Sequence, residues 1–88
     1  MSRKIILVGD RTSHGGVVLQ GSHSMVIGGK NVALIGDMVS CPQCKGNYPI
    51  AEGSSRMREN GRGVALEGMK PACGAELIAS QSSVSADE

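Results

Sequence analysis

The sequence predicts a small all-β protein made of one domain. Thirteen glycines are spread over 88 residues, and the short clusters of β-branched residues between them are typical of strands joined by tight turns. No window of about a dozen residues keeps a helical period free of Gly and Pro, apart from a weak one near the C-terminus. A chain of this length forms a single core. We therefore expect one domain over residues 1–80, followed by a flexible, Ser-rich and acidic tail over residues 81–88.

The expected strands are the short apolar clusters that turn residues separate. In order, they are Lys4–Val8, Val17–Gln20, Met25–Ile27, Val32–Ile35, Tyr48–Glu52, Val64–Leu66 and Glu76–Ala79. Gly29 and Gly61 each precede a basic residue and then a Val-Ala-Leu segment. Because glycine readily adopts the positive φ of a tight turn, both segments predict a hairpin whose apolar residues form the returning strand.

The sequence also repeats itself at a shift of 32 residues. The matching pairs are Gly21 with Gly53, Ser22 with Ser54, Met25 with Met57, Gly29 with Gly61, Val32-Ala33-Leu34 with Val64-Ala65-Leu66, Gly36 with Gly68, and Cys41 with Cys73. Glycine stands five residues before a potential metal ligand three times, at Gly9 and His14, Gly36 and Cys41, and Gly68 and Cys73. This periodicity indicates three strand-turn units that converge on one point.

Four side chains are candidate metal ligands: His14, Cys41, Cys44 and Cys73. The two-residue gap between Cys41 and Cys44 suits chelation of one tetrahedral ion, and a set of three thiolates and one imidazole suits zinc. Such a complete set leaves no open position for water, so we expect one structural zinc ion and no catalytic residues. His23 is a reserve ligand, although Ser55 takes its place in the next repeat.

Metal binding also fits the thin core that the composition allows. The chain has no Phe or Trp and a single Tyr, and small domains of this kind are commonly stabilised by a metal, disulfides or oligomerisation. An odd number of cysteines argues against a complete disulfide set. Asp10 and Asp37, which follow two of the repeated glycines, are expected to accept backbone hydrogen bonds in their turns.

Two other classes of protein stay open from the residues alone. A Cys-x-x-Cys pair can be a redox dithiol, although the segment after Cys44 is a poor helix start for activating a thiol. A free-standing zinc module could instead bind protein or nucleic acid, but a net charge of +1 and one tyrosine disfavour nucleic acid. The N-terminal apolar run of four residues is too short for a signal peptide or a membrane span, so we expect synthesis in the cytoplasm.

Several motifs together resemble a known family. They are Gly9-Asp10-Arg11-Thr12-Ser13-His14-Gly15-Gly16, Gly29-Lys30-Asn31-Val32-Ala33-Leu34-Ile35-Gly36-Asp37, and Val39-Ser40-Cys41-Pro42-Gln43-Cys44. Over roughly residues 5–79 the chain is similar to PAAR-repeat proteins, the conical tip of the type VI secretion spike. The chain departs from that family in two ways. It offers one His and three Cys where many relatives are histidine-rich, and Asn31-Val32-Ala33-Leu34 and Gly63-Val64-Ala65-Leu66 replace Pro-Ala-Ala-Arg.

The resemblance implies a fold and a function. It implies a small cone of three β-hairpin-like units around a pseudo-threefold axis, with zinc near the apex held by His14, Cys41, Cys44 and Cys73. It further implies a base seated on the trimeric valine-glycine-repeat spike protein (VgrG), which the cone would cap and sharpen. The chain would then be a non-enzymatic monomer, cytoplasmic until the system delivers it outside the cell or into a target cell. It would bind no nucleic acid, make no stable membrane insertion, and travel with effectors supplied by other polypeptides. For the contact with the spike protein we expect Val17, Val18, Val32 and Val64.

Overall fold

A computed structural model describes residues 2–59, 61–80 and 85–87 of the chain. Within these ranges the regular elements are strands and no segment is helical, which confirms the all-β prediction. It follows that none of these residues belongs to a helix long and apolar enough to span a bilayer. The strands are β1 (Ser2–Lys4), β2 (Arg11–Thr12), β3 (Val26–Ile27), β4 (Lys30–Asn31), β5 (Met38–Cys41), β6 (Gly46–Pro49), β7 (Arg58–Glu59), β8 (Arg62–Gly63), β9 (Leu77–Ile78) and β10 (Ser85–Asp87).

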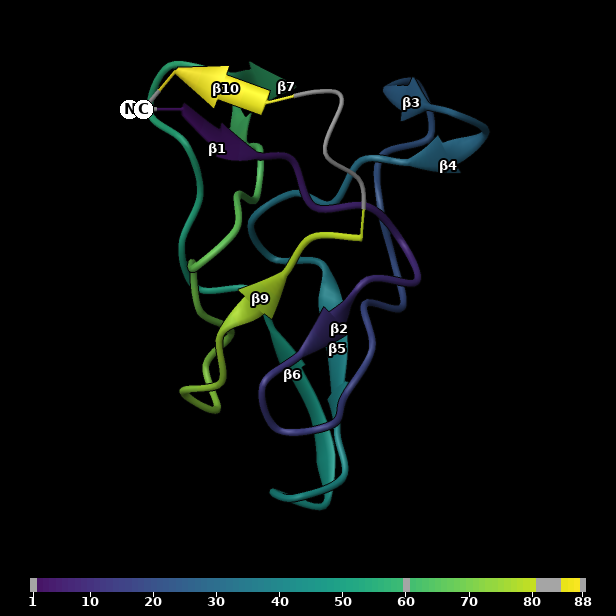
Figure 1. The fold of residues 1–88 in the computed structure, drawn as a ribbon, viewed down its shortest axis with the longest axis vertical. Helices are drawn as coiled ribbons and strands as arrows, with labels where there is room; N and C mark the ends of the chain where they lie inside the picture. The colour runs from purple at the N-terminus through teal and green to yellow at the C-terminus, as the bar shows by residue number, and fades with distance from the viewer. Residues whose placement is uncertain (1, 60, 81–84, 88) are drawn as a thin grey trace.

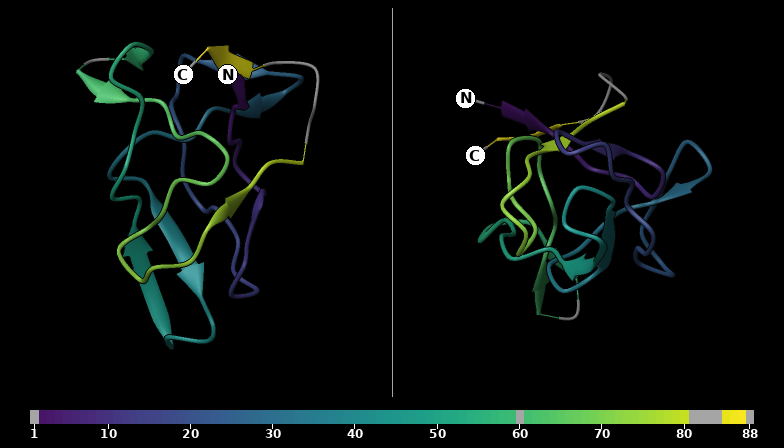
Figure 2. Two further views of the ribbon diagram at one scale, coloured as in Figure 1. Left: turned by 60° about the vertical axis from the view of Figure 1, so that its left-hand side comes forward. Right: turned by 90° about the horizontal axis from the view of Figure 1, so that it is seen from below.

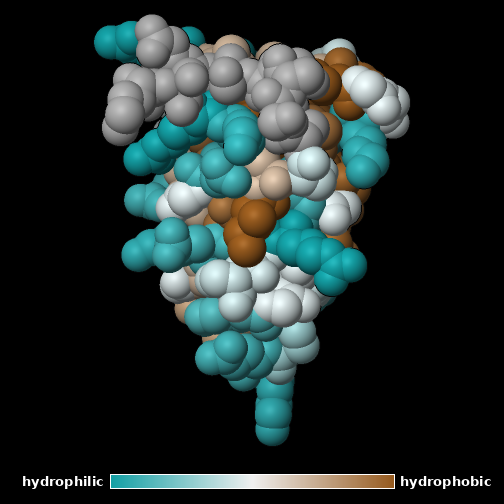
Figure 3. Space-filling view, in the orientation of Figure 1, coloured by the Kyte–Doolittle hydropathy of each residue, from teal (hydrophilic) through white to brown (hydrophobic). Residues whose placement is uncertain are grey.

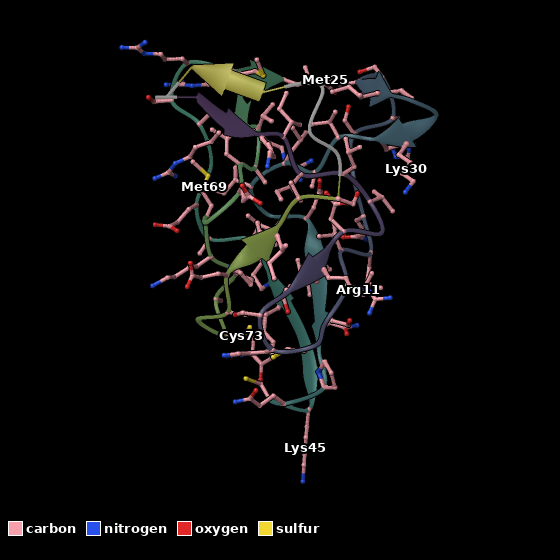
Figure 4. All side chains as sticks on the ribbon, in the orientation of Figure 1. Arg11, Met25, Lys30, Lys45, Met69 and Cys73 are labelled. Atoms are coloured by element: carbon pink, nitrogen blue, oxygen red, sulfur yellow. The ribbon has the colours of Figure 1, made fainter. Side chains whose placement is uncertain are left out.

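The molecule is a small cone with principal dimensions of 31 × 24 × 24 Å. Its strands pair antiparallel in twos, as β1 with β10, β2 with β9, β3 with β4, β5 with β6, and β7 with β8. β5 and β6 run toward the narrow end, whereas β1, β3, β4, β7 and β10 lie at the wide end (Figure 1). The space-filling view shows the same taper, with polar side chains covering the narrow end (Figure 3). Lys45 is the outermost side chain there (Figure 4).

A closed ring of backbone hydrogen bonds lies at the centre of the cone. Ile6 N–H donates to Ala65 O (3.0 Å), Ala65 N–H to Ala33 O (2.9 Å), and Ala33 N–H to Ile6 O (2.9 Å). All three residues are fully buried. The ring therefore joins three segments, residues 5–7, 32–34 and 64–66, in cyclic order, and their side chains form most of the hydrophobic core.

This ring explains why three of the expected strands are not continuous ladders. The apolar segments of Lys4–Val8, Val32–Ile35 and Val64–Leu66 instead form isolated bridges, Ile5 with Leu66, Leu7 with Val32, and Leu34 with Val64. Each segment pairs with one neighbour at its first residue and with the other neighbour at its last. A segment shared in this way cannot form a long ladder with either neighbour. The pseudo-threefold axis for whole repeats stays a prediction.

A tight turn follows each ring segment and sends the chain toward the narrow end. Gly9, Gly36 and Gly68 adopt φ values of 93°, 92° and 88°, a region that favours glycine. In the first two turns a buried aspartate accepts the backbone bond, as predicted: Leu7 N–H donates to Asp10 Oδ2 (2.8 Å), and Leu34 N–H donates to Asp37 Oδ2 (2.9 Å). In the third turn Leu66 N–H donates to Met69 Sδ (3.4 Å).

The hairpin predicted at Gly29 is present as β3–β4. Gly28 and Gly29 form its two-residue turn with φ values of 59° and 83°, as a hairpin of this length requires. The returning strand is Lys30–Asn31, so the apolar residues after it belong to the ring and not to the hairpin, contrary to the prediction. The second hairpin, β7–β8, has the same offset between its strands.

The remaining strand predictions were partly right. Glu76–Ala79 contains β9, and Tyr48–Glu52 overlaps the end of β6, whereas Val17–Gln20 makes only single bridges. Strand β5 was not expected, although it is one of the two longest. Residues 81–84 and 88 of the predicted tail lie outside the described residues, while residues 85–87 form β10 beside β1.

Candidate metal centre

The four predicted ligands come from three parts of the chain. His14 lies in the turn after β2, Cys41 is the last residue of β5, Cys44 lies in the β5–β6 turn, and Cys73 lies in the turn before β9. After each ring segment, a glycine turn leads the chain into the narrow half of the cone, where the four predicted ligands lie. Figure 4 shows Cys73 there, above the β5–β6 turn that carries Lys45.

The ligand atoms of these four side chains form one compact group. They all lie within 4.8 Å of one another, and Cys41 Sγ is 3.7 Å from His14 Nδ1. A tetrahedral zinc ion with bonds of about 2.3 Å to sulfur places sulfur ligands about 3.8 Å apart. Cys41 is buried and the other three residues are partly buried. The arrangement and its soft donors therefore fit a single tetrahedral metal ion.

The Cys-x-x-Cys segment is folded for chelation by its own backbone. Cys44 N–H donates to Cys41 O (3.1 Å) and Lys45 N–H to Pro42 O (3.3 Å), so two successive turns bring both thiols to the same side. The hydroxyl of Tyr48 donates to Cys44 O (3.1 Å) and fastens the turn to β6. Lys45 has a φ of 58°, a conformation that is uncommon for a residue other than glycine.

The turn that carries His14 is held against β5 by residues that the sequence did not single out. The Thr12 hydroxyl accepts from His14 N–H (3.3 Å) and Gly16 N–H (3.1 Å). A Cβ atom at Gly16 would lie 1.8 Å from Ser40 O, so only glycine permits this approach. Glycines are frequent throughout the chain, and the sequence carried no signal that distinguished Gly16 from the others.

The third turn is tied to the first. Gly74 N–H donates to Pro71 O (3.0 Å), which closes the turn around Cys73. Ser13 N–H donates to Glu76 O (2.9 Å), and Glu76 N–H donates to Ser13 Oγ (2.9 Å). These reciprocal bonds fix the segment with His14 beside the segment with Cys73, so two of the predicted ligands are positioned together.

The reserve ligand His23 lies elsewhere. It is exposed and lines a surface depression of about 520 Å³ together with Glu59 and Arg62. Hydrogen bonds from the Ser22 and Ser24 hydroxyls, with smaller contributions from the charges of Arg62 and His23, lower the pKa of Glu59. His23 is not part of the group of side chains near Cys41, which is made of the four predicted ligands.

The chemistry of this centre favours a structural role. Three sulfurs and one imidazole already provide four ligands, so a tetrahedral ion held by all of them has no open position for a substrate. Bound there, the ion would join three parts of the chain. The redox interpretation expected a helix beside Cys41, whereas that residue ends strand β5.

The comparison with protein families gives one result over most of the chain. A profile described as PAAR motif matches residues 8–79, a range that contains the four predicted ligands and all three glycine turns. No curated protein matches the chain.

Proposed function

This chain belongs to the PAAR motif family, and on that premise we propose that it caps and sharpens the end of the trimeric VgrG spike. The family is structural and not enzymatic, and its motif is associated with the tip of the type VI secretion spike. In the proposed complex the wide end sits on the spike protein and the narrow end points forward.

The difference between the two ends of the cone is the observation that carries this proposal. At the narrow end, the β5–β6 turn is polar and the predicted metal ligands gather just above it. At the wide end, short strand pairs surround partly buried apolar side chains that pack against the core, namely Met25, Ile27 and Met57. Val26 is 51% exposed there. Open strand edges and apolar side chains suit contact with the last layer of a β-helix.

The expected contact residues need correction. Val18, Val32 and Val64 are fully buried in the core, so these side chains are not available to a partner, whereas Val17 is only partly buried. We place the contact instead on the strand pairs of the wide end, with Val26 as its most exposed large apolar residue there.

The cyclic arrangement also supports a threefold partner. Three ring segments make the same backbone hydrogen bonds to one another in turn, and this order would let one chain present similar surfaces to three subunits. Delivery from the cytoplasm by type VI secretion, and carriage of effectors made as separate polypeptides, belong to the same proposal.

Co-purification with the cognate VgrG β-helix is the direct test. The zinc-loaded protein is expected to bind the trimeric end with a ratio of one chain per trimer, as measured by analytical ultracentrifugation. The same measurement with a VgrG variant lacking its terminal β-helical layer should show no complex. Failure of the zinc-loaded protein to bind the intact cognate trimer would contradict the proposal. Binding to nucleic acid instead would favour a free-standing zinc module.

A further inference from the structure

The first and last strands of the structure occupy the place of a third hairpin. β1 and β10 pair antiparallel at the wide end, with Ser2 opposite Asp87, Arg3 opposite Ala86, and Lys4 opposite Ser85. Seen along the long axis, this pair, the β3–β4 hairpin and the β7–β8 hairpin project toward three different sides (Figure 2, right). The backbone pairing shows that the three are equivalent.

The first part of this equivalence comes from the ring. Ile5, Val32 and Val64 each begin a ring segment, and each pairs with the last residue of a neighbouring segment. β1, β4 and β8 end immediately before these three residues. The three strands therefore enter the ring at the same point.

The second part comes from the register of the partner strands. The last residues of β1, β4 and β8 are Lys4, Asn31 and Gly63, and each lies opposite the first residue of its partner strand. Those first residues are Ser85, Val26 and Arg58. The register of the β1–β10 pair thus equals that of the two hairpins.

The third part comes from the path that leads to the partner strands. Gly9, Gly36 and Gly68 donate their N–H groups to Val18 O, Ile50 O and Leu77 O, respectively. Val26, Arg58 and Ser85 each lie eight residues after those acceptors. β10 is therefore the counterpart of β3 and β7. The difference is the connection, because a local turn joins the other two pairs while β1 and β10 come from opposite ends of the sequence.

We propose that the β1–β10 pair is the third contact element for the spike end, so that residues 85–87 are part of the docking surface. This inference rests on the proposed function. Each pair carries one basic residue at the same register position, Arg3 opposite Ala86, Lys30 opposite Ile27, and Arg62 opposite Glu59. All three basic residues are exposed, but Arg62 already forms an ion pair with Asp37 inside the chain. The fitting occupant is the threefold end of a β-helix that presents carboxylates to Arg3 and Lys30.

Ala86→Pro tests the contribution of β10, with Ala86→Ser as its matched control. Proline lacks the N–H group and restricts φ, so it opposes pairing with β1. We expect Ala86→Pro to retain the full metal content, to lose hydrogen-exchange protection at the Arg3 amide, and to bind the VgrG trimer about tenfold more weakly. Ala86→Ser should match the parent. Unchanged affinity in Ala86→Pro would overturn the proposal.

A circular permutant tests the equivalence without removing any strand. Ala86 is joined to Arg3 through an Asn-Gly turn that replaces Asp87 and Ser2, as Gly28-Gly29 joins Ile27 to Lys30, and the chain is opened between Gly28 and Gly29. The permutant should fold, bind the same amount of zinc and bind the trimer as the parent does. Failure to fold would overturn the equivalence of the three pairs.

The two proposals fail in different ways. If the parent, the permutant and Ala86→Ser all fail to bind the trimer, the proposed function is wrong. If the parent binds and Ala86→Pro binds equally well, only the role of residues 85–87 is wrong. Hydrogen exchange in the free protein reports the β1–β10 pairing in either case.

Discussion

The two ends of the cone reach order by different physical means. The wide half is built on apolar burial around a closed ring of backbone bonds, with Ile6, Ala33 and Ala65 at its centre. The narrow half has short turns and polar side chains, with Cys41 as its buried member among the four ligands. The hydrophobic core therefore stabilises the wide half, and another interaction is needed to hold the narrow end. Hydrogen bonds between Ser13 and Glu76 join two of the three turns there, and we propose that a bound metal ion joins all three.

Removing two of the thiols should lower the stability of the narrow half more than any other change considered below. In Cys41→Ser with Cys73→Ser, only His14 and Cys44 remain of the four ligands. Because metal-binding free energy is folding free energy in small metallodomains, we expect loss of bound zinc and a drop in Tm of roughly 15 °C or more. Calorimetry together with elemental analysis measures both. A melt unchanged from the parent would show that the narrow end needs no ion.

The identity of the histidine ligand gives a smaller and more specific effect. His14→Cys keeps four soft donors, so zinc content and Tm should stay near those of the parent. His14→Ala leaves three ligands, and we expect zinc affinity to fall by about 10–100-fold or more. Competition with a chromogenic chelator measures the affinity. Equal affinities for the two variants would place His14 outside the ligand set.

The glycine turns offer a test in the wide half. Asp37 is buried, accepts from Leu34 N–H, and forms an ion pair with Arg62, so Asp37→Ala should lower the free energy of unfolding by about 2–4 kcal/mol. Met69→Leu removes only the weaker bond to sulfur in the equivalent turn and should cost less than about 1.5 kcal/mol. Urea unfolding of both variants, with zinc bound, compares them. Equal losses would mean that the carboxylate adds nothing to the turn.

Strain in the tip turn predicts a gain in stability. Lys45 adopts a φ of 58°, which glycine accommodates more easily, so Lys45→Gly should stabilise the zinc-bound protein by about 0.5–1 kcal/mol. Lys45→Ala removes the same side chain without relieving the backbone and serves as the control. Thermal unfolding of the two variants distinguishes relief of backbone strain from loss of the Lys45 side chain. A larger gain in the alanine variant would point to the charge of Lys45 instead.

The smallest effect concerns pH and lies at the wide end. The folded protein lowers the pKa of Glu59 below its ordinary value of 4.5, so its contribution is present above that pH and is lost as pH falls through the folded pKa. Glu59→Gln should therefore melt slightly below the parent at pH 6, and the gap should close on acidification below about pH 4.5. A gap that is independent of pH would exclude the carboxylate as its cause.

The sequence predicted that His14, Cys41, Cys44 and Cys73 lie together because the spacing of metal ligands follows from their chemistry. Local turns bring Cys41 and Cys44 close to each other, and the repeated glycines marked the places of His14 and Cys73. The pairing of strands could not be predicted in the same way. The ring joins Ile6, Ala33 and Ala65, which are far apart in the sequence. A local cluster of β-branched residues predicts a strand, but it does not indicate that the strand will pair with two different segments.

Two other features depended on partners that only the structure shows. Gly16 must be glycine because Ser40 O lies too close for any side chain. β10 belongs to the wide end because it pairs with β1. The expected contacts at Val32 and Val64 were wrong for a related reason. Their β-branched side chains were predicted to lie in strands, but the ring buries them.

The central claim is that a metal ion bound by His14, Cys41, Cys44 and Cys73 holds the narrow end. The most direct measurement is the Tm of the purified protein, with its metal content, before chelation, after chelation and after zinc is restored. We predict one zinc ion per chain, a large fall in Tm when it is removed, and recovery when it returns. A metal-free protein that melts cooperatively at the same temperature as the zinc-loaded protein would contradict the claim.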